Sequence, residues 1–265
     1  MRKPAAWYDL YERSVQSPKS HIDWVVSIYH DRRGRYPVHL REDFCGTFQL
    51  SCAWVRRNRK NTAICLDLDS EPLAYGKRKH YALLTPEQRR RLRIHRKNVL
   101  SVTSPKADVI LVGNFSFFIL RRREELLAYF ANARRSLGRG GVFLLEMAGG
   151  PGMIGKMVER RTVRKGKGAR FVYLWEQKDF DPIANRGQYA IHFLLPNGNK
   201  IRDAFTYDWR LWSIPEVRDA LREVGFSDSV VYWETSFKGE GTGEFLPTDA
   251  GDNAYSWIAY VVGLK

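Results

Sequence analysis

The stretch that decides the fold is Leu40–Arg57, LREDFCGTFQLSCAWVRR. A short apolar stretch ends in the acidic pair Glu42 and Asp43, small residues follow at Cys45–Thr47, and an amphipathic segment begins directly after them. A strand that ends in an acid and passes through a tight turn into a helix is how α/β proteins build a nucleotide-binding corner. Similar turns occur in many unrelated loops, so the rest of the chain must support this interpretation.

Length and composition indicate a globular protein. The chain has 265 residues, of which 44% are hydrophobic and 13% aromatic, enough for one large domain with an insertion. The longest nearly uncharged run, residues 107–120, is shorter than the roughly 20 residues of a membrane-spanning helix, so we expect no membrane span. No signal-peptide core is present at the N-terminus, and the three cysteines lack metal-ligand spacing. We therefore expect a cytoplasmic protein without a bound metal.

The chain is strongly basic, with a formal net charge of +15. Such an excess can attract phosphate-bearing partners through counterion release. The basic clusters are scattered along the chain and are not interleaved with aromatic residues as in an RNA-binding sheet, so we favour solvated helix faces. The clusters are Arg56–Lys60, Lys77–His80, Arg89–Lys97, Arg121–Arg123 and Arg160–Arg170.

Strand-like and helical patterns alternate through the first 150 residues, after a helical segment at Ile22–Arg32. Alternation of this kind predicts right-handed βαβ units and a parallel sheet with helices on both faces. The apolar runs are Val38–Glu42, Thr62–Leu68, Leu92–Lys97, Ala107–Gly113 and Gly141–Met147. The helices between them are Phe48–Arg59, Glu71–Leu84 and Arg121–Leu137, the last of which we expect to stop at Gly138 in the run GRGG.

The pattern changes after Gly150. Three runs of alternating polarity, Arg170–Gln177, Gln188–Leu195 and Lys200–Asp208, are separated by DPIANRG and PNGN, which is turn chemistry for an antiparallel meander. A helix at Pro215–Val224 and strands at Ser229–Thr235 and Ser256–Val262 close the chain. The predicted organisation is a helical cap (1–37), a Rossmann-like core (38–150), an antiparallel insertion or lid (151–212) and a C-terminal part that completes the core sheet (213–265).

Polar residues stand where the predicted parallel strands end. Asp67 ends the second strand, and an acid there can accept hydrogen bonds from both ribose hydroxyls of a nucleoside. Asn98 follows the third strand, and its amide can pair with an adenine edge. Asn114 follows the fourth strand. These strand ends, taken with Glu42, indicate a site for an adenosine-type ligand.

Together the motifs resemble the class I S-adenosylmethionine-dependent methyltransferases, over roughly residues 8–265. Residues Glu42–Phe48, which contain C-G-T, are similar to the family's first motif, and DLDSEPLAYGK is similar to the second. Asn98-Val99 resembles the third motif and Gly113–Ser116 the fourth. The segment PEVRDALREVGF resembles a common ending of the family's sequences. Phe44 and Phe48 stand where the family usually has glycine, so we expect the backbone there to follow a different path. A dinucleotide-binding dehydrogenase is disfavoured because G-x-G-x-x-G does not occur.

The resemblance implies S-adenosylmethionine as the cofactor, with an N-terminal segment that folds over it. The implied cofactor-binding residues are Tyr11, Glu42, Phe44, Cys45, Gly46, Thr47, Asp67, Leu68, Asn98, Val99, Asn114 and Phe115. Structural alternatives stay open: Tyr8 and Tyr11 fit a packed helical stripe, and Asn98 and Phe115 fit loop and packing roles. Cys45 is interpreted as a small turn residue rather than a nucleophile.

The predicted function is methyl transfer to nitrogen or oxygen of a small-molecule acceptor, with the insertion roofing the acceptor pocket. Transfer from a sulfonium depends mainly on positioning and needs a base only when the acceptor must lose a proton, so no catalytic residue is assigned. Glu146, Tyr207 and Arg210 are acceptor-side candidates. The alternatives are an RNA methyltransferase that uses the basic surface and a noncatalytic binding protein of the same fold.

Overall fold

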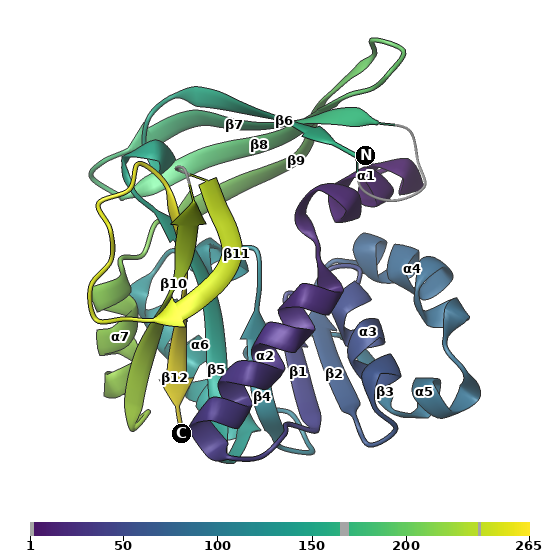
Figure 1. The fold of residues 1–265 in the computed structure, drawn as a ribbon, viewed down its shortest axis with the longest axis vertical. Helices are drawn as coiled ribbons and strands as arrows, with labels where there is room; N and C mark the ends of the chain where they lie inside the picture. The colour runs from purple at the N-terminus through teal and green to yellow at the C-terminus, as the bar shows by residue number, and fades with distance from the viewer. Residues whose placement is uncertain (1–2, 165–169, 238–239) are drawn as a thin grey trace.

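The computed structural model describes residues 3–164, 170–237 and 240–265 (Figure 1). Its main feature is an eight-stranded sheet in the order β11-β10-β12-β5-β4-β1-β2-β3. The strands are β1 (His39–Asp43), β2 (Thr62–Asp67), β3 (Leu92–Arg96), β4 (Ala107–Val112), β5 (Leu137–Gly149), β10 (Asp228–Phe237), β11 (Glu240–Pro247) and β12 (Trp257–Leu264). Strands β1 to β5 are parallel, whereas β12 runs antiparallel to β5 and β10, and β11 antiparallel to β10.

Helices cover both faces of this sheet, as predicted. On one face α2 (Pro18–Arg33), α3 (Gln49–Arg57) and α4 (Ser70–Lys79) contribute to a core that includes Tyr29, Trp54 and Leu73. On the other face α6 (Arg123–Ser136) and α7 (Ile214–Glu223) contribute to a second core that includes Phe130 and Leu221. A short helix, α5 (Pro86–Arg90), precedes β3, and three 3-10 turns lie at Tyr81–Leu83, Ser116–Ile119 and Pro151–Met153. No helix in the described part of the chain is long and apolar enough to cross a membrane.

Local chemistry explains where these helices begin and end. The α2 helix has Pro18 in its first turn and ends at Gly34, whose φ of 65° is the left-handed conformation that glycine adopts without strain. The side chain of Asp69 caps α4 by accepting the N–H of Glu71. Ser213 and Glu216 form a reciprocal capping box at the start of α7.

A second, wholly antiparallel sheet follows β5, which confirms the predicted insertion. It contains β6 (Met157–Val163), β7 (Phe171–Asp181), β8 (Arg186–Leu194) and β9 (Lys200–Arg210), in that order. In Figure 1 it lies across the top of the main sheet, above the helix α1 (Ala5–Val15). Leu10 of α1 packs with Phe171 and Phe193 of this sheet, so the N-terminal helix and the insertion share one small core.

Two local expectations were wrong or incomplete. The α6 helix ends at Ser136, and the GRGG run belongs to β5, which begins at Leu137. Residues 97–106, where no helix was predicted, are turns and irregular backbone. Strands β6 and β11 were not predicted. Most side chains of β6 are exposed, so its sequence MVERRTV has no apolar alternation, and β11 contains two glycines and ends in a proline.

Candidate functional site

A cavity lies at the carboxyl ends of β1, β4 and β5, where the second sheet and α1 cover the main sheet. The turn after β1 forms one wall, Glu146 of β5 lies at another, and Phe205 and Tyr207 of β9 contribute from the second sheet. The lining residues are Lys3, Tyr8, Tyr11, Gln16, Pro18, His21, Glu42, Asp43, Phe44, Cys45, Gly46, Thr47, Leu50, Asp69, Pro72, Leu111, Gly113, Asn114, Ser116, Glu146, Phe205, Tyr207 and Tyr260.

The turn after β1 has a strained backbone. Phe44 and Phe48 have φ values of 53° and 45°, the left-handed conformation, and Gly46 between them has a φ of 51°. The two phenylalanines therefore adopt a backbone conformation that favours glycine, and the expected difference in path from the family stays a prediction. A side chain in this conformation costs roughly 1–2 kcal/mol, and such strain persists where the surrounding structure holds it. The buried ring of Phe48 helps to keep the turn in this conformation, because it packs directly against Gly76 of α4.

Glu42 joins the end of β1 to the start of α3. Its Oε2 accepts hydrogen bonds from the backbone N–H of Ser51, at 2.9 Å, and from the Ser51 hydroxyl. Burial raises the pKa of Glu42 to about 7, although both hydrogen bonds from Ser51 lower it. Both hydrogen bonds from Ser51 are made to Oε2, and Glu42 lines the cavity. A cation bound there would favour the ionised form of this carboxyl group.

The two acids after β2 have different roles. Asp67 accepts the N–H of Gly46 at 2.7 Å with Oδ2 and the N–H of Asp69 at 2.8 Å with Oδ1. Burial raises the pKa of Asp67, and these backbone hydrogen bonds lower it. Asp67 thus positions the turn from just outside the cavity lining, whereas Asp69 lines the cavity. The predicted contact of Asp67 with a ribose stays a prediction.

A buried ion pair lies beneath the turn, on the α6 side of β1. Arg41 and Asp43 are joined by Nε–Oδ1 at 2.7 Å and Nη2–Oδ2 at 3.1 Å, and neither side chain is exposed to solvent. The hydroxyl of Tyr129 also donates to Asp43, at 2.8 Å. Arg41 donates further to the carbonyl oxygen of Val99, at 2.6 Å, which links β1 to the segment after β3. Sequence reasoning missed this pair, although two opposite charges two residues apart in one strand must share a face.

Glu146 marks the other end of the cavity. Its carboxylate is 7% exposed and accepts hydrogen bonds from the backbone N–H of Asn114 and from the hydroxyl of Tyr260. Burial raises the pKa of Glu146, while the nearby His21 and the hydrogen bonds lower it. Burial also raises the pKa of Tyr11, to about 12, and this tyrosine is hydrogen-bonded to Tyr207. A buried carboxylate is thus accompanied by three tyrosines that line the same cavity.

The structure brings together seven of the twelve residues implied to bind cofactor: Tyr11, Glu42, Phe44, Cys45, Gly46, Thr47 and Asn114 line the cavity. The other five, Asp67, Leu68, Asn98, Val99 and Phe115, are not part of its lining. Leu68 is 59% exposed, Val99 is buried in the α6-side core, and the Asn98 side chain accepts the N–H of Leu100.

Of the acceptor-side candidates, Glu146 and Tyr207 line the cavity, and Arg210 does not. The guanidinium of Arg210 stacks on Trp212 at 3.7 Å and pairs with Glu216, which is a packing role. Sequence reasoning missed lining residues such as Lys3, His21, Asp69, Phe205 and Tyr260. Asp69 was the one with a usable signal, because it directly precedes a helix and lies two residues after the strand-end acid.

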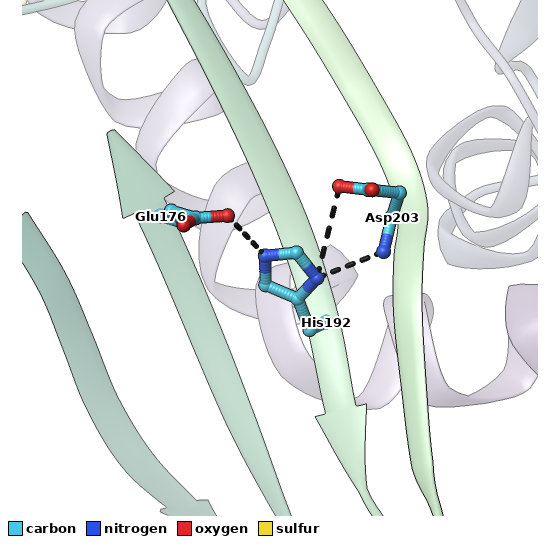
Figure 2. Close-up of side chains that lie close together, drawn as sticks. All are labelled: Glu176, His192 and Asp203. Atoms are coloured by element: carbon cyan, nitrogen blue, oxygen red, sulfur yellow. Dashed lines mark hydrogen bonds and ion pairs between the residues drawn. The ribbon is translucent and has the colours of Figure 1, made fainter. Parts of the chain in front are cut away.

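A second polar cluster lies in the antiparallel sheet, outside the cavity (Figure 2). His192 lies between Glu176 and Asp203, and its Nδ1 accepts the backbone N–H of Asp203 at 2.8 Å. The proton of the neutral ring is therefore on Nε2, which donates to Glu176 at 2.9 Å. Asp203 also pairs with Lys178. A cation would have to displace these interactions, so the cluster links β7, β8 and β9 rather than offering an open metal site.

Comparison with known proteins identifies the fold. No protein-family model matches the sequence, and no curated protein matches it. An S-adenosylmethionine-dependent methyltransferase from Clostridium acetobutylicum is 16% identical, with a TM-score of 0.69 and 98% of each chain covered. The sugar N-methyltransferase KedS8 from Streptoalloteichus sp. is 20% identical, with a TM-score of 0.64, over 97% of this chain and 92% of that one.

The amino pentose methyltransferase CalS10 from Micromonospora echinaspora, whose structure contains S-adenosylmethionine, is 16% identical, with a TM-score of 0.67 and 96% of each chain covered. These identities are low, but the similarity extends over almost the whole of each chain. The chain therefore has the fold of the class I S-adenosylmethionine-dependent methyltransferases that its sequence motifs resemble.

Proposed function

We propose that the protein transfers a methyl group from S-adenosylmethionine to a small-molecule acceptor. One observation carries this proposal: a single cavity extends from the strained turn at Cys45–Thr47 to the buried carboxylate of Glu146, and Phe205 and Tyr207 of the second sheet line it. A donor at the turn and an acceptor at Glu146 would share one covered site, where positioning and exclusion of water supply most of the acceleration. Proteins of similar fold described as sugar and amino pentose methyltransferases support a small acceptor.

The residues present fit the proposed donor. S-Adenosylmethionine carries an ammonium, a sulfonium and two ribose hydroxyls, all of which interact favourably with carboxylates. Glu42 and Asp69 offer carboxylates on the wall formed by the turn and the start of α4. The donor supplies an activated methyl group. The protein's part is to hold the turn in its left-handed conformation, through Asp67 and Phe48, and to keep the donor oriented.

The structural divisions suit this function. We propose that residues 1–37 act as a cap, 38–150 as the donor-binding core, 151–212 as the lid over the acceptor, and 213–265 as the part that completes the sheet. Tyr11 of α1 and Tyr207 of β9, which are hydrogen-bonded to each other and line the cavity, support a joint role for cap and lid. The three cysteines are free and buried, which fits the reducing cytoplasm that we propose as the location.

Calorimetry with S-adenosylhomocysteine, the demethylated product, tests the donor site first. We expect micromolar binding, and no heat or thermal shift at millimolar ligand would contradict the proposal. Incubation with labelled donor, a metabolite extract and total RNA then tests the acceptor class. Label is expected in the small-molecule fraction, and label found in RNA alone would favour the RNA methyltransferase alternative.

A further inference from the structure

The charge of the cavity is opposite to that of the protein. The whole chain carries a formal net charge of +15, yet the cavity is lined by four acids. The acids are Glu42, Asp43, Asp69 and Glu146, and the basic groups among the described lining residues are Lys3 and His21. The charge of Arg41 compensates that of Asp43. The other acids of the lining, Glu42, Asp69 and Glu146, still outnumber its basic groups, although the protein as a whole is basic. A cavity of this kind favours cationic ligands and disfavours phosphates.

Glu146 differs from the other buried acids in its partners. Glu12 pairs with His80 and Lys79, and Asp43 pairs with Arg41. Among the described residues no lysine or arginine forms an ion pair with Glu146, whose carboxylate is 7% exposed and lines the cavity; its basic neighbour is His21, which lowers the pKa of Glu146. A buried carboxylate is stable in its charged form only with a partner of opposite charge or with enough hydrogen-bond donors. Glu146 lines the cavity, so a ligand bound there can supply such a partner.

We propose that the acceptor is an amine, and that its ammonium form binds to the carboxylate of Glu146 beside the rings of Tyr11 and Tyr207. This inference rests on the proposed function and narrows it to N-methylation. A carboxylate gives an ammonium a charge-assisted hydrogen bond, and the faces of aromatic rings attract cations. An alcohol of the same shape can donate a hydrogen bond to the carboxylate, but it carries no positive charge and so gains neither the ion pairing nor the attraction to the rings. The specificity of the site is therefore for charge on the acceptor rather than for a hydroxyl.

The reaction also needs a group that takes a proton, since an ammonium nitrogen has no lone pair with which to attack. His21 lines the cavity at the start of α2, and its Nδ1 donates to the carbonyl oxygen of Ser17 at 3.1 Å. This hydrogen bond places a proton on Nδ1, so in the neutral ring the lone pair is on Nε2. The ammonium loses one proton to Nε2 of His21, and the freed nitrogen lone pair attacks the methyl carbon. The N–C bond forms as the S–C bond breaks, and its electron pair stays on sulfur.

Binding of a matched pair of probes tests the amine site without a known acceptor. The probes are cyclohexylamine, charged at pH 7.5, and cyclohexanol, which has the same ring and no charge. Each is titrated calorimetrically into the protein saturated with S-adenosylhomocysteine. We expect wild type to bind the amine about tenfold or more tightly than the alcohol, the scale of one charge-assisted hydrogen bond. Glu146→Gln should remove this preference.

Glu234→Gln is the matched control. Glu234 is a half-buried glutamate whose Oε1 accepts the N–H of Gly243, and it does not line the cavity. This variant should keep the preference for the amine. Equal affinity of wild type for both probes, or a preference that survives Glu146→Gln, would overturn the inference. Failure of wild type to bind S-adenosylhomocysteine would instead contradict the proposed function, so the two failures are distinguishable.

Discussion

The carboxylate of Asp67 accepts the backbone N–H of Gly46 at 2.7 Å and so joins the end of β2 to the turn after β1. Asp67→Ala removes the acceptor of this hydrogen bond and also the acceptor of the hydrogen bond from the N–H of Asp69. We expect the variant to bind S-adenosylhomocysteine more weakly by about 1.5–3 kcal/mol, the scale of hydrogen bonds to a charged group. Calorimetry measures the affinity, and circular dichroism shows that the fold survives.

A comparison of Asp67→Ala with Asp69→Ala separates the positioning of the turn from direct contact with the bound ligand. Asp69 lines the cavity and also caps α4 through the N–H of Glu71, a cap that contributes about 1 kcal/mol to stability. If Asp67 acts on the turn, a folded Asp67→Ala variant loses affinity even though Asp67 lies outside the lining. Unchanged affinity in that folded variant would mean that the turn holds its conformation without Asp67.

Gly76 in α4 is required by the turn rather than by the helix. A Cβ added there would lie 2.6 Å from a ring carbon of Phe48 and closer still to the backbone oxygen of Thr47. Alanine normally stabilises a helix interior relative to glycine by up to about 1 kcal/mol. Here we expect Gly76→Ala to destabilise by about 1–3 kcal/mol through overpacking and to weaken product binding. Urea unfolding and calorimetry measure both effects.

Lys77→Ala, one residue further along α4 at an exposed position, is the control for this helix. Surface substitutions of this kind usually change stability by less than about 0.5 kcal/mol. A stabilised Gly76→Ala variant with normal product affinity would show that the turn can move away from α4.

The buried pair of Arg41 and Asp43 gives a prediction about stability. Arg41→Leu leaves the Asp43 carboxylate buried with, among the described residues, only the Tyr129 hydroxyl as a side-chain donor. Removal of one member of a buried pair costs about 3–5 kcal/mol, because the remaining charge is uncompensated. The double variant Arg41→Leu/Asp43→Leu should recover part of this loss. Equilibrium unfolding in urea compares the three proteins, and a single variant as stable as wild type would contradict the prediction.

Glu42 should make the stability of the unliganded protein depend on pH. Its folded-state pKa is raised by burial to about 7, above its ordinary value of 4.5. A carboxyl group with a raised folded-state pKa contributes stability that is fully present below 4.5 and is lost as pH rises through about 7. The shift corresponds to about 3 kcal/mol.

Glu42→Gln removes this titration and can still accept the hydrogen bonds of Ser51. Unfolding free energies of wild type and variant are compared at pH 5 and pH 8. Relative to the variant, wild type should lose about 2–3 kcal/mol between these two pH values. Parallel pH profiles for the two proteins would show that Glu42 does not titrate in this range.

The parallel sheet could be predicted from the sequence mainly because central strands such as β4 are buried on both faces and form continuous apolar runs, here ADVILV. Strand β6 was not readable, because it is mostly exposed and its charged side chains show no period. The residues of the site also fall into those that the sequence predicts and those that it does not. The acids at the strand ends are local features of the sequence, whereas Phe205 and Tyr260 reach the cavity only through the placement of β9 and β12. Such long-range contacts have no local signature.

The basic run at Arg121–Arg123 tests whether the positive charge of the protein serves nucleic acid. In the structure each of these arginines already has an acidic partner on the surface. The pairs are Arg121 with Asp208, Arg122 with Glu125, and Arg123 with Glu223. Charges that are compensated in this way attract phosphates weakly, so the run does not form a free phosphate-binding patch.

Methyl transfer should therefore respond little to salt. A protein that neutralises several phosphates loses orders of magnitude in affinity between about 50 and 200 mM salt, because counterions are released on binding. An acceptor held inside a cavity is screened much less, so we expect turnover to change less than about threefold over that range. Arg121→Gln/Arg122→Gln/Arg123→Gln should likewise leave turnover nearly unchanged, because these side chains do not line the cavity. Transfer of label to total RNA that collapses with salt, and that the triple variant abolishes, would contradict the small-molecule proposal and favour an RNA acceptor.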